Sequence, residues 1–196
     1  RLDPEQIDEA NRIVENSADI EKALKLFTII ARDLKRIPGP PLPLYLTWIP
    51  SANTTINDKM GNETSRGLAL AALLKAVGLD VNLGLVAYND RSQLYPDFPD
   101  AQALDGVIAV LNLGDKKYFL DPTQLTADAD VPSSKLQGAR IILLKDNHSE
   151  IVKIPTSSPD SSETRVKYRI RIDRQGRVKG SMEATLFGNE AGLLRR

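Results

Sequence analysis

The residues that could carry chemistry in this chain are mainly carboxylates, because the usual nucleophiles and bases are scarce. The sequence has no cysteine and a single histidine, His148. A cysteine nucleophile, disulfides and thiolate metal ligands are therefore excluded. His148 lies in a polar tight-turn sequence between two apolar runs, which predicts an exposed loop residue and makes a zinc site unexpected. We expect neither a metal nor a cofactor.

Among the carboxylates, Glu63 is singled out by its place at the start of the most apolar helix that the sequence predicts. Met60–Asn62 indicates a turn, Thr64 or Ser65 can cap the helix start, and Gly78 fits a left-handed residue just beyond its end. A helix that is apolar on most of its circumference is expected at the centre of a core. Its N-terminus stabilises the anion of Glu63 and lowers the pKa of this carboxyl group.

Two helices and an extended connector precede the central helix. Asp3 followed by Pro4 is typical of a helix start, and a second helix is predicted from Ser17 to about Lys35 by its apolar three-four spacing. The proline-rich stretch within Ile37–Pro50 cannot form a helix or a central strand. The single tryptophan, Trp48, lies there, and it either packs on the core or forms a wall of a binding cleft.

Strands follow the central helix. Val81–Tyr88 is rich in β-forming residues, and Asn89–Asp105 is a long polar loop of the kind that is often functional. Two hairpins are then predicted by paired apolar runs around turn sequences; they comprise Val107–Leu113 with Tyr118–Leu120, and Ile141–Leu144 with Glu150–Ile154. The pattern predicts an α+β fold, with helices segregated to one side of an antiparallel sheet.

The composition divides the chain into three segments, which are a domain over residues 1–154, a linker over 155–163 and a further segment over 164–196. The linker is rich in proline and serine. Beyond it, alternating apolar and basic residues predict a half-buried antiparallel hairpin. Since two strands alone are marginal in water, this segment either begins a C-terminal β domain or docks onto the first domain. Its basic stripe is expected to be a solvated strand face, with anion binding as the alternative; it contains Arg165, Lys167, Arg169 and Arg171.

The charge balance and the hydropathy argue against nucleic-acid binding and against a membrane-spanning segment. Basic and acidic residues number 26 each, which gives no electrostatic argument for nucleic-acid binding. No apolar run is long enough to cross a bilayer, so no membrane span is expected.

The order of these elements, with three short motifs, resembles the transglutaminase-like superfamily of papain-related folds over about residues 20–125. The Gly-Asn-Cys helix start of that family is matched by Gly61–Glu63, and the helix end by Ala76–Leu79. The strand that carries the family's histidine is matched by Leu104–Ile108. Its aspartate stands in a Tyr-hydrophobic-Leu-Asp-Pro-Thr motif, which Tyr118–Thr123 matches most specifically.

The resemblance implies a catalytic triad that has lost two members. The cysteine position is Glu63, the histidine position is Gly106, and only Asp121 is retained. The family's chemistry needs a thiolate and a base, so the resemblance implies a catalytically inactive domain that acts as a binding or structural module. Its ligand would be a peptide, a protein or a glycan in the former cleft, which the resemblance assigns to Trp48, Glu63, Tyr88, Asp105 and Asp121.

Two alternatives remain open. Glu63 and Asp121 could act as paired carboxylates in a hydrolase or transferase with altered chemistry, or hold a divalent cation with Asp105. A purely structural spacer is the other possibility. The resemblance further implies a larger, exported bacterial protein of the cell envelope, in which β domains of unknown function flank the transglutaminase-like core.

Overall fold

The structure is a computed structural model in which residues 1–39, 49–95, 97, 100–124, 129–158 and 163–187 are described. The elements, in chain order, are the helices α1 (Pro4–Val14), α2 (Asp19–Asp33), α3 (Ala52–Asn57), α4 (Glu63–Ala76) and the short 3-10 helix η3 (Ala101–Ala103), and the strands β1 (Lys35–Arg36), β2 (Met60–Gly61), β3 (Val81–Val86), β4 (Gly106–Leu113), β5 (Lys116–Leu120), β6 (Arg140–Leu144), β7 (Ser149–Lys153), β8 (Thr164–Ile172) and β9 (Val178–Leu186).

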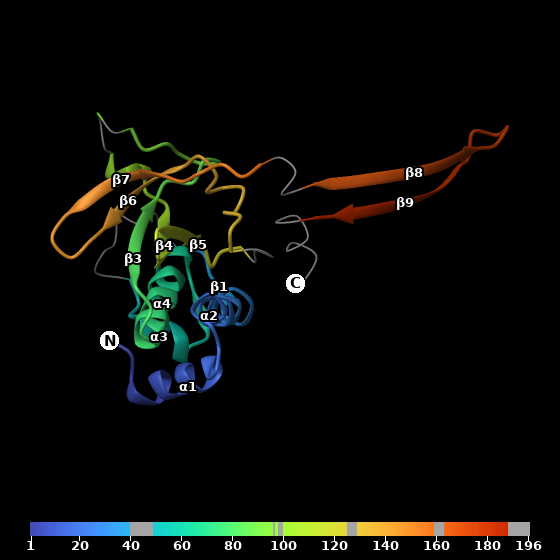
Figure 1. Cartoon of the computed structure of the whole chain (residues 1–196). Coiled ribbons are helices and arrows are strands. Elements are labelled where there is room, and N and C mark those ends of the chain that lie inside the picture. Colours follow the sequence, from blue (N-terminus) through green and yellow to red (C-terminus); the bar gives the residue numbers. More distant parts are fainter. Residues whose placement is uncertain (40–48, 96, 98–99, 125–128, 159–162, 188–196) are drawn as a thin grey trace.

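The fold is α+β, as the pattern predicted, with its helices gathered at one side of an antiparallel sheet (Figure 1). The sheet has the strand order β5-β4-β3-β6-β7, and each of its pairs is antiparallel. Both predicted hairpins, β4–β5 and β6–β7, are confirmed. Residues Gly106 to Leu111 of β4 are buried without interruption, because this strand is covered on both faces.

Alternate residues of β4 enter two separate cores. Ala109 and Leu111 join the core that α4 shares with α1 and α2, whereas Ile108 and Val110 lie in a second core on the other face of the sheet. Leu70 and Leu74 of α4 are fully buried in the first core. The prediction that α4 is the central helix is therefore confirmed.

The two ends of α4 are capped by different hydrogen bonds. Gly78 has φ +82°, the left-handed conformation expected of it, and the next residue, Leu79, donates its N–H to the Leu74 carbonyl at 3.1 Å. At the start, the prediction that Thr64 or Ser65 caps the helix was wrong. Asn62 is the cap, and its Oδ1 accepts the Ser65 N–H at 2.8 Å.

The segment before α4 also differs from its prediction. Met60 and Gly61 form the short strand β2, which pairs in parallel with β1, where a turn was expected. This pairing attaches the end of α2 to the start of α4. A six-residue helix, α3, lies between the connector and β2, and no prediction was made for it.

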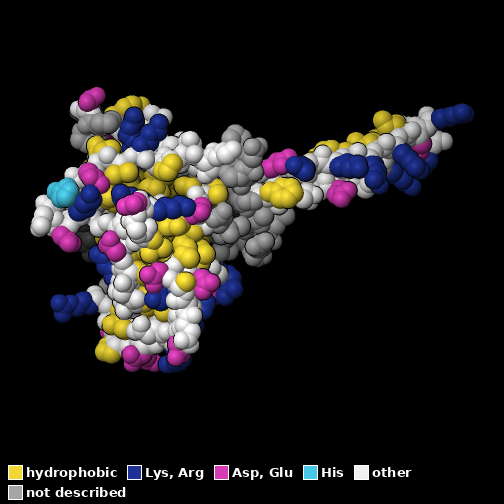
Figure 2. All heavy atoms as spheres, in the orientation of Figure 1, with side chains coloured by type: hydrophobic (Ala, Val, Ile, Leu, Met, Phe, Trp, Pro, Cys, Tyr) yellow, Lys and Arg dark blue, Asp and Glu magenta, His cyan; other side chains and the backbone are white. Residues whose placement is uncertain are grey.

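The hairpin β8–β9 projects away from the body of the protein (Figure 1). Its residues alternate between an apolar face and a basic face, as predicted (Figure 2). The prediction of half-burial was wrong: six large apolar residues of the two strands are between 43% and 70% exposed, namely Val166, Tyr168, Ile170, Ile172, Val178 and Met182. Among the described residues, nothing covers the apolar face of the hairpin, and the bounds of the domains stay a prediction.

Within the described ranges, no helix is both long and apolar enough to cross a membrane.

Candidate functional site

The N-terminus of α4 is held against the start of β4 by a close contact between backbones. A Cβ atom on Gly67 would lie 1.9 Å from the Val107 carbonyl oxygen, so only glycine permits this approach. One turn earlier on the helix, Glu63 faces Gly106 with more space between them. A Cβ atom on Gly106 would lie 3.1 Å from the Glu63 Cβ. The structure thus places positions 63 and 106 in direct contact.

Two arginines converge on the Glu63 carboxylate. Arg36 of β1 donates a short hydrogen bond to its Oε1, and a guanidinium nitrogen of Arg91 lies 3.7 Å from the same oxygen. Burial alone would raise the pKa of Glu63, but the helix-start N–H, Arg36 and Arg91 outweigh it and hold the pKa below its ordinary value. Glu63 is therefore a stable anion at neutral pH, with its side chain 12% exposed.

Asp105 connects this ion-pair group to the long loop after β3. Its Oδ2 accepts hydrogen bonds from the Tyr88 backbone N–H at 2.8 Å and from the Ser92 hydroxyl at 2.9 Å. Its other oxygen lies 3.9 Å from Arg91. Asp105 therefore fixes the start of the loop that delivers Arg91 to Glu63.

The Asp121 carboxylate lies behind these residues and is bound by neutral donors. The Tyr88 hydroxyl donates to Oδ1 at 3.2 Å, and the Thr123 backbone N–H donates to the same atom at 2.9 Å. The Ser133 hydroxyl donates to Oδ2 at 3.4 Å. Burial raises the pKa of Asp121 despite these donors. Burial and the nearby Asp121 charge also raise the pKa of Tyr88 well above its ordinary value, so the phenol keeps its proton.

The ring of Tyr88 fills the space between positions 106 and 121. A Cβ atom on Gly106 would lie 3.8 Å from the ring edge, at Cε2, while the hydroxyl on the adjacent ring carbon reaches Asp121. Because position 106 is a glycine, Asp121 has no imidazole to orient, and the Tyr88 hydroxyl binds it instead.

The structure brings together four of the five residues named for the former cleft. Tyr88 and Asp121 are each 1% exposed, so neither faces solvent, whereas Glu63 and Asp105 are partly accessible. Trp48 lies outside the described residues. His148 is exposed in the β6–β7 turn, as predicted.

Arg36 and Arg91 were missed by the sequence analysis, although both contact the central carboxylate of the site. Each arginine is about half exposed, with 50% and 43% of its side chain accessible. No local pattern distinguishes them from ordinary surface arginines. The pairing of β1 with β2 brings Arg36 to Glu63, and the turn after Tyr88, in which the Arg91 N–H donates to the Tyr88 carbonyl at 2.9 Å, brings Arg91 there.

The chemistry open to this arrangement is limited by its electrostatics. Glu63 is an ion-paired anion with a lowered pKa, which makes it a weak base. Asp121 is enclosed by hydrogen-bond donors and inaccessible to a substrate. In the part of the chain that the structure describes, no three histidine, aspartate, glutamate or cysteine side chains gather in a way that could hold a metal ion.

Comparison of the sequence with models of known protein families and with curated proteins gave no match. Two solved structures are similar to this chain. One is described as a "putative protease" from Parabacteroides distasonis; it has 16% identity and a TM-score of 0.59, over 78% of this chain and 28% of that one. The other is described as a "putative cysteine protease" from Cytophaga hutchinsonii, with 14% identity, a TM-score of 0.49 and coverage of 94% and 50%.

The likeness to the Parabacteroides protein shows that the two chains share a fold. This chain spans only 28% of the length of that protein and half the length of the Cytophaga protein. Neither description therefore gives the activity of this chain.

Proposed function

We propose that this chain is a transglutaminase-like, papain-related domain that has lost its cysteine chemistry and serves as a binding or structural module. The proposal rests on one observation. A Cβ atom at position 106, at the start of β4, would lie 3.1 Å from the Cβ of Glu63 at the start of α4, and these are the positions that the resemblance assigns to the histidine and the cysteine. A thiolate and an imidazole at these two positions would lie side by side, as nucleophilic catalysis requires.

Asp121 supports the same interpretation. It follows β5 in the predicted motif and reaches toward position 106 through Tyr88. In a complete triad, the third residue orients the histidine. Here the Tyr88 phenol occupies the intervening space and satisfies the carboxylate, so the framework is retained while its nucleophile and base are replaced.

The alternative, an enzyme that uses the Glu63 and Asp121 carboxylates, receives less support. Acid–base catalysis by two carboxylates needs both groups to reach the substrate, one of them with a raised pKa. The carboxyl group with the raised pKa is Asp121, which is buried, whereas the accessible one, Glu63, has a lowered pKa. A divalent cation would also compete with Arg36 and Arg91 for Glu63.

The surface that we propose for binding is the group formed by Arg36, Glu63, Arg91 and Asp105. Both arginines expose about half of their side chains, and they are already oriented by the two carboxylates. Such a group can bind a peptide, a protein or a glycan through hydrogen bonds that a fixed guanidinium donates. Tyr88 and Asp121 support this surface from below.

We further propose that the chain belongs to a larger, exported protein of the cell envelope, in which segment 164–196 begins a C-terminal β domain. The exposed apolar face of β8–β9 supports this proposal, because two strands with an uncovered apolar face are only marginally stable. Separation of cell fractions with an antibody to this chain tests the location. Recovery in the cytoplasmic fraction would contradict it.

The activity test compares the wild-type protein with Glu63→Ala in casein hydrolysis and in the incorporation of a fluorescent amine into casein. We expect no turnover above the buffer rate for either protein. Turnover by the wild-type protein that Glu63→Ala abolishes would instead establish the altered-chemistry enzyme.

A further inference from the structure

The group of Arg36, Glu63, Arg91 and Asp105 presents its positive charges to solvent and keeps its negative charges largely buried. The side chains of Arg36 and Arg91 are 50% and 43% exposed. Those of the carboxylates Glu63 and Asp105 are only 12% and 14% exposed. A molecule that approaches from solvent therefore meets guanidinium groups first. Guanidinium groups bind carboxylates through paired hydrogen bonds, so this surface suits a ligand that carries a carboxylate.

The two guanidinium groups are neighbours, and most of their donors are not used within the protein. Both approach the same atom, Glu63 Oε1, to which Arg36 donates a short hydrogen bond and from which Arg91 lies 3.7 Å away. The contact of Arg91 with Asp105 is 3.9 Å long. Both Arg91 distances exceed the length of a hydrogen bond, and its guanidinium donates to no described residue. Since an arginine side chain has five N–H donors, both arginines can donate to a ligand.

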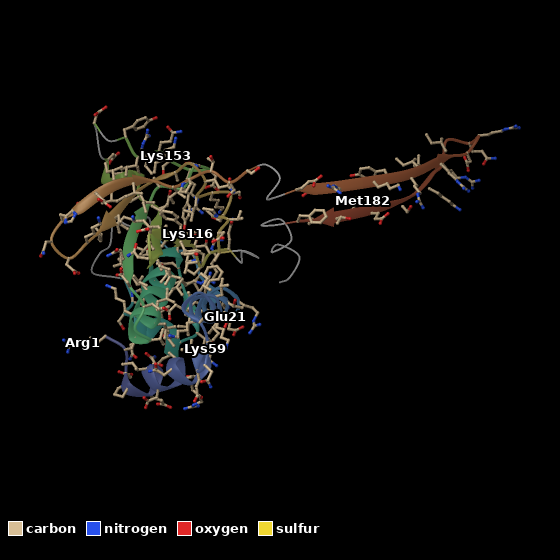
Figure 3. The ribbon with its side chains drawn as sticks, in the orientation of Figure 1. Arg1, Glu21, Lys59, Lys116, Lys153 and Met182 are labelled. Carbon is tan, nitrogen blue, oxygen red and sulfur yellow. The ribbon has the colours of Figure 1, made fainter. Side chains whose placement is uncertain are left out.

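The backbone of β1 has a free edge at Arg36. In the described part of the chain β1 pairs with β2 alone. The Lys35 N–H donates at 2.8 Å to the carbonyl of Lys59, the residue just before β2 that Figure 3 labels. The Ile37 N–H donates to the Gly61 carbonyl at 3.1 Å. Since alternate N–H groups of a strand point to opposite edges, the Arg36 N–H points away from β2, and it donates to no described residue. An unpaired edge of this kind can bind the extended backbone of a peptide.

Arg91 is also attached to a backbone that hydrogen bonds hold in place. Its N–H donates to the Tyr88 carbonyl at 2.9 Å, and the hydroxyl of the next residue, Ser92, donates to Asp105 at 2.9 Å. The guanidinium carbon lies 5.9 Å from the centre of the Tyr88 ring, which is a cation–π contact. An arginine that is oriented in this way loses little conformational freedom when a ligand binds.

We propose that this surface binds an acidic peptide. A carboxylate of the peptide accepts hydrogen bonds from the guanidinium groups of Arg36 and Arg91, and a backbone carbonyl of the peptide accepts the Arg36 N–H. The carboxylate can come from an acidic side chain or from the C-terminus of the peptide. The inference rests on the proposed function, because it names the class of ligand for the same surface, and no covalent step is involved.

The test is a titration of the intact chain at pH 7 with the blocked peptide acetyl-Ala-Glu-Ala-amide, followed through the Nε–H resonances of Arg36 and Arg91. The glutamine peptide has the same shape without the charge, and the lysine peptide has the opposite charge. We expect the glutamate peptide to bind about fivefold more tightly than the glutamine peptide, and the lysine peptide to bind least. The glutamine peptide with a free C-terminus shows which source of the carboxylate binds better. Glucuronate offers the same carboxylate on a sugar and should bind more weakly than the glutamate peptide, because it has no peptide backbone to pair with β1.

Variants of Arg91 separate the charge from the geometry of the guanidinium. Arg91→Gln should weaken binding of the glutamate peptide about fivefold and leave the glutamine peptide unchanged. Arg91→Lys keeps the charge but loses the planar pair of donors, so it should weaken binding about twofold. Arg12→Gln removes an exposed charge from α1, outside the group, and should change the binding of neither peptide.

The inference is overturned if the glutamate and glutamine peptides bind equally, if the lysine peptide or glucuronate binds best, if neither arginine resonance shifts, or if Arg91→Gln binds like the wild-type protein. None of these results affects the loss of cysteine chemistry, which is judged by turnover. Cleavage of the peptide during the titration would instead contradict the proposed function, whatever the order of the affinities.

Discussion

The Cβ atom of Glu63 lies 3.1 Å from the point at which a side chain at position 106 would begin. This contact joins the N-terminus of a buried helix to the start of a buried strand, and it is possible because Gly67 lets the helix touch the Val107 carbonyl one turn later. The short distance between positions 63 and 106 is the feature around which the other residues of the site are arranged. Two arginines stabilise Glu63, which stands where the sequence motifs led us to expect the cysteine of the family they resemble, and Tyr88 fills the space beside it.

Gly67→Ala should destabilise the protein although alanine favours helices by about 1 kcal/mol over glycine. The added methyl group would lie 1.9 Å from a backbone oxygen, so α4 must move away from β4, at a net cost of about 1–3 kcal/mol. Urea unfolding measures the difference. Gly78→Ala is the control, because its cost comes from φ +82° alone and nothing lies within 4 Å. A Gly67→Ala protein as stable as the wild type would contradict the close approach.

Arg66→Met should lower the free energy of unfolding by about 2–4 kcal/mol, since hydrogen bonds from charged groups are strong and their loss leaves buried acceptors. Arg66 is 3% exposed and donates from Nη2 to the Ile30 and Ala31 carbonyls, each at 2.9 Å, near the end of α2. Those carbonyls lie in the last turn, where intrahelical partners are lacking. Lys75→Met, an exposed change on the same helix, should cost less than about 0.5 kcal/mol. Equal losses for the two variants would argue against the capping role.

Glu63→Gln should cost about 0.5–1 kcal/mol at pH 7, because the partner arginines are half exposed and solvent screens the pairs. The pKa of Glu63 is lowered in the folded protein. Its contribution is therefore present above the ordinary glutamate pKa and is lost as the pH falls through the folded value. Unfolding followed over a series of pH values from 7 downward should show a gap between the two proteins that narrows as acid protonates the Glu63 carboxylate. A gap independent of pH would contradict this.

The stability of the Asp121→Asn variant relative to the wild-type protein should increase as the pH rises, because the wild-type protein loses stability. The pKa of Asp121 is raised by burial above its ordinary 3.8, so the unfolded chain releases this proton first. Wild-type stability then falls from about pH 4 upward by ~1.4 kcal/mol for each unit of pKa shift. Tyr88→Phe removes a donor that lowers this pKa and should steepen the loss. Parallel pH profiles for Asp121→Asn and the wild-type protein would contradict the raised pKa.

The sequence predicted the elements well where a strong local pattern exists. The apolar periodicity of α2 and α4, the left-handed Gly78 and both sheet hairpins follow from neighbouring residues, and the structure contains them. The α3 helix has only six residues, too few for a clear period. Asn62, Thr64 and Ser65 are all good caps, and only the backbone conformation at residue 62 decides among them.

The contacts of the site were harder to predict, because they join distant parts of the chain. Arg36 and Glu63 are 27 residues apart, and Tyr88 and Asp121 are 33 apart. The sequence also contains no sign that Arg66 is buried, since the carbonyl groups that accept its hydrogen bonds belong to another helix. The apolar face of β8–β9 was expected to be half buried because of its alternation, but alternation gives only the face and not the element that covers it.

Placing a cysteine at position 63 and a histidine at position 106 tests most directly the claim that these two positions once held the catalytic pair. The chain has no cysteine of its own, so Glu63→Cys, Glu63→Cys/Gly106→His and the exposed control Lys75→Cys each carry one thiol, whose alkylation by iodoacetamide can be followed against pH. We predict a thiol pKa below the ordinary value of about 8.5 for Glu63→Cys, and a pKa at least ~1 unit lower still with the histidine. Lys75→Cys should titrate near 8.5. If the double variant titrates like Lys75→Cys, positions 63 and 106 do not form a cysteine–histidine pair, and the proposed origin of the site is wrong.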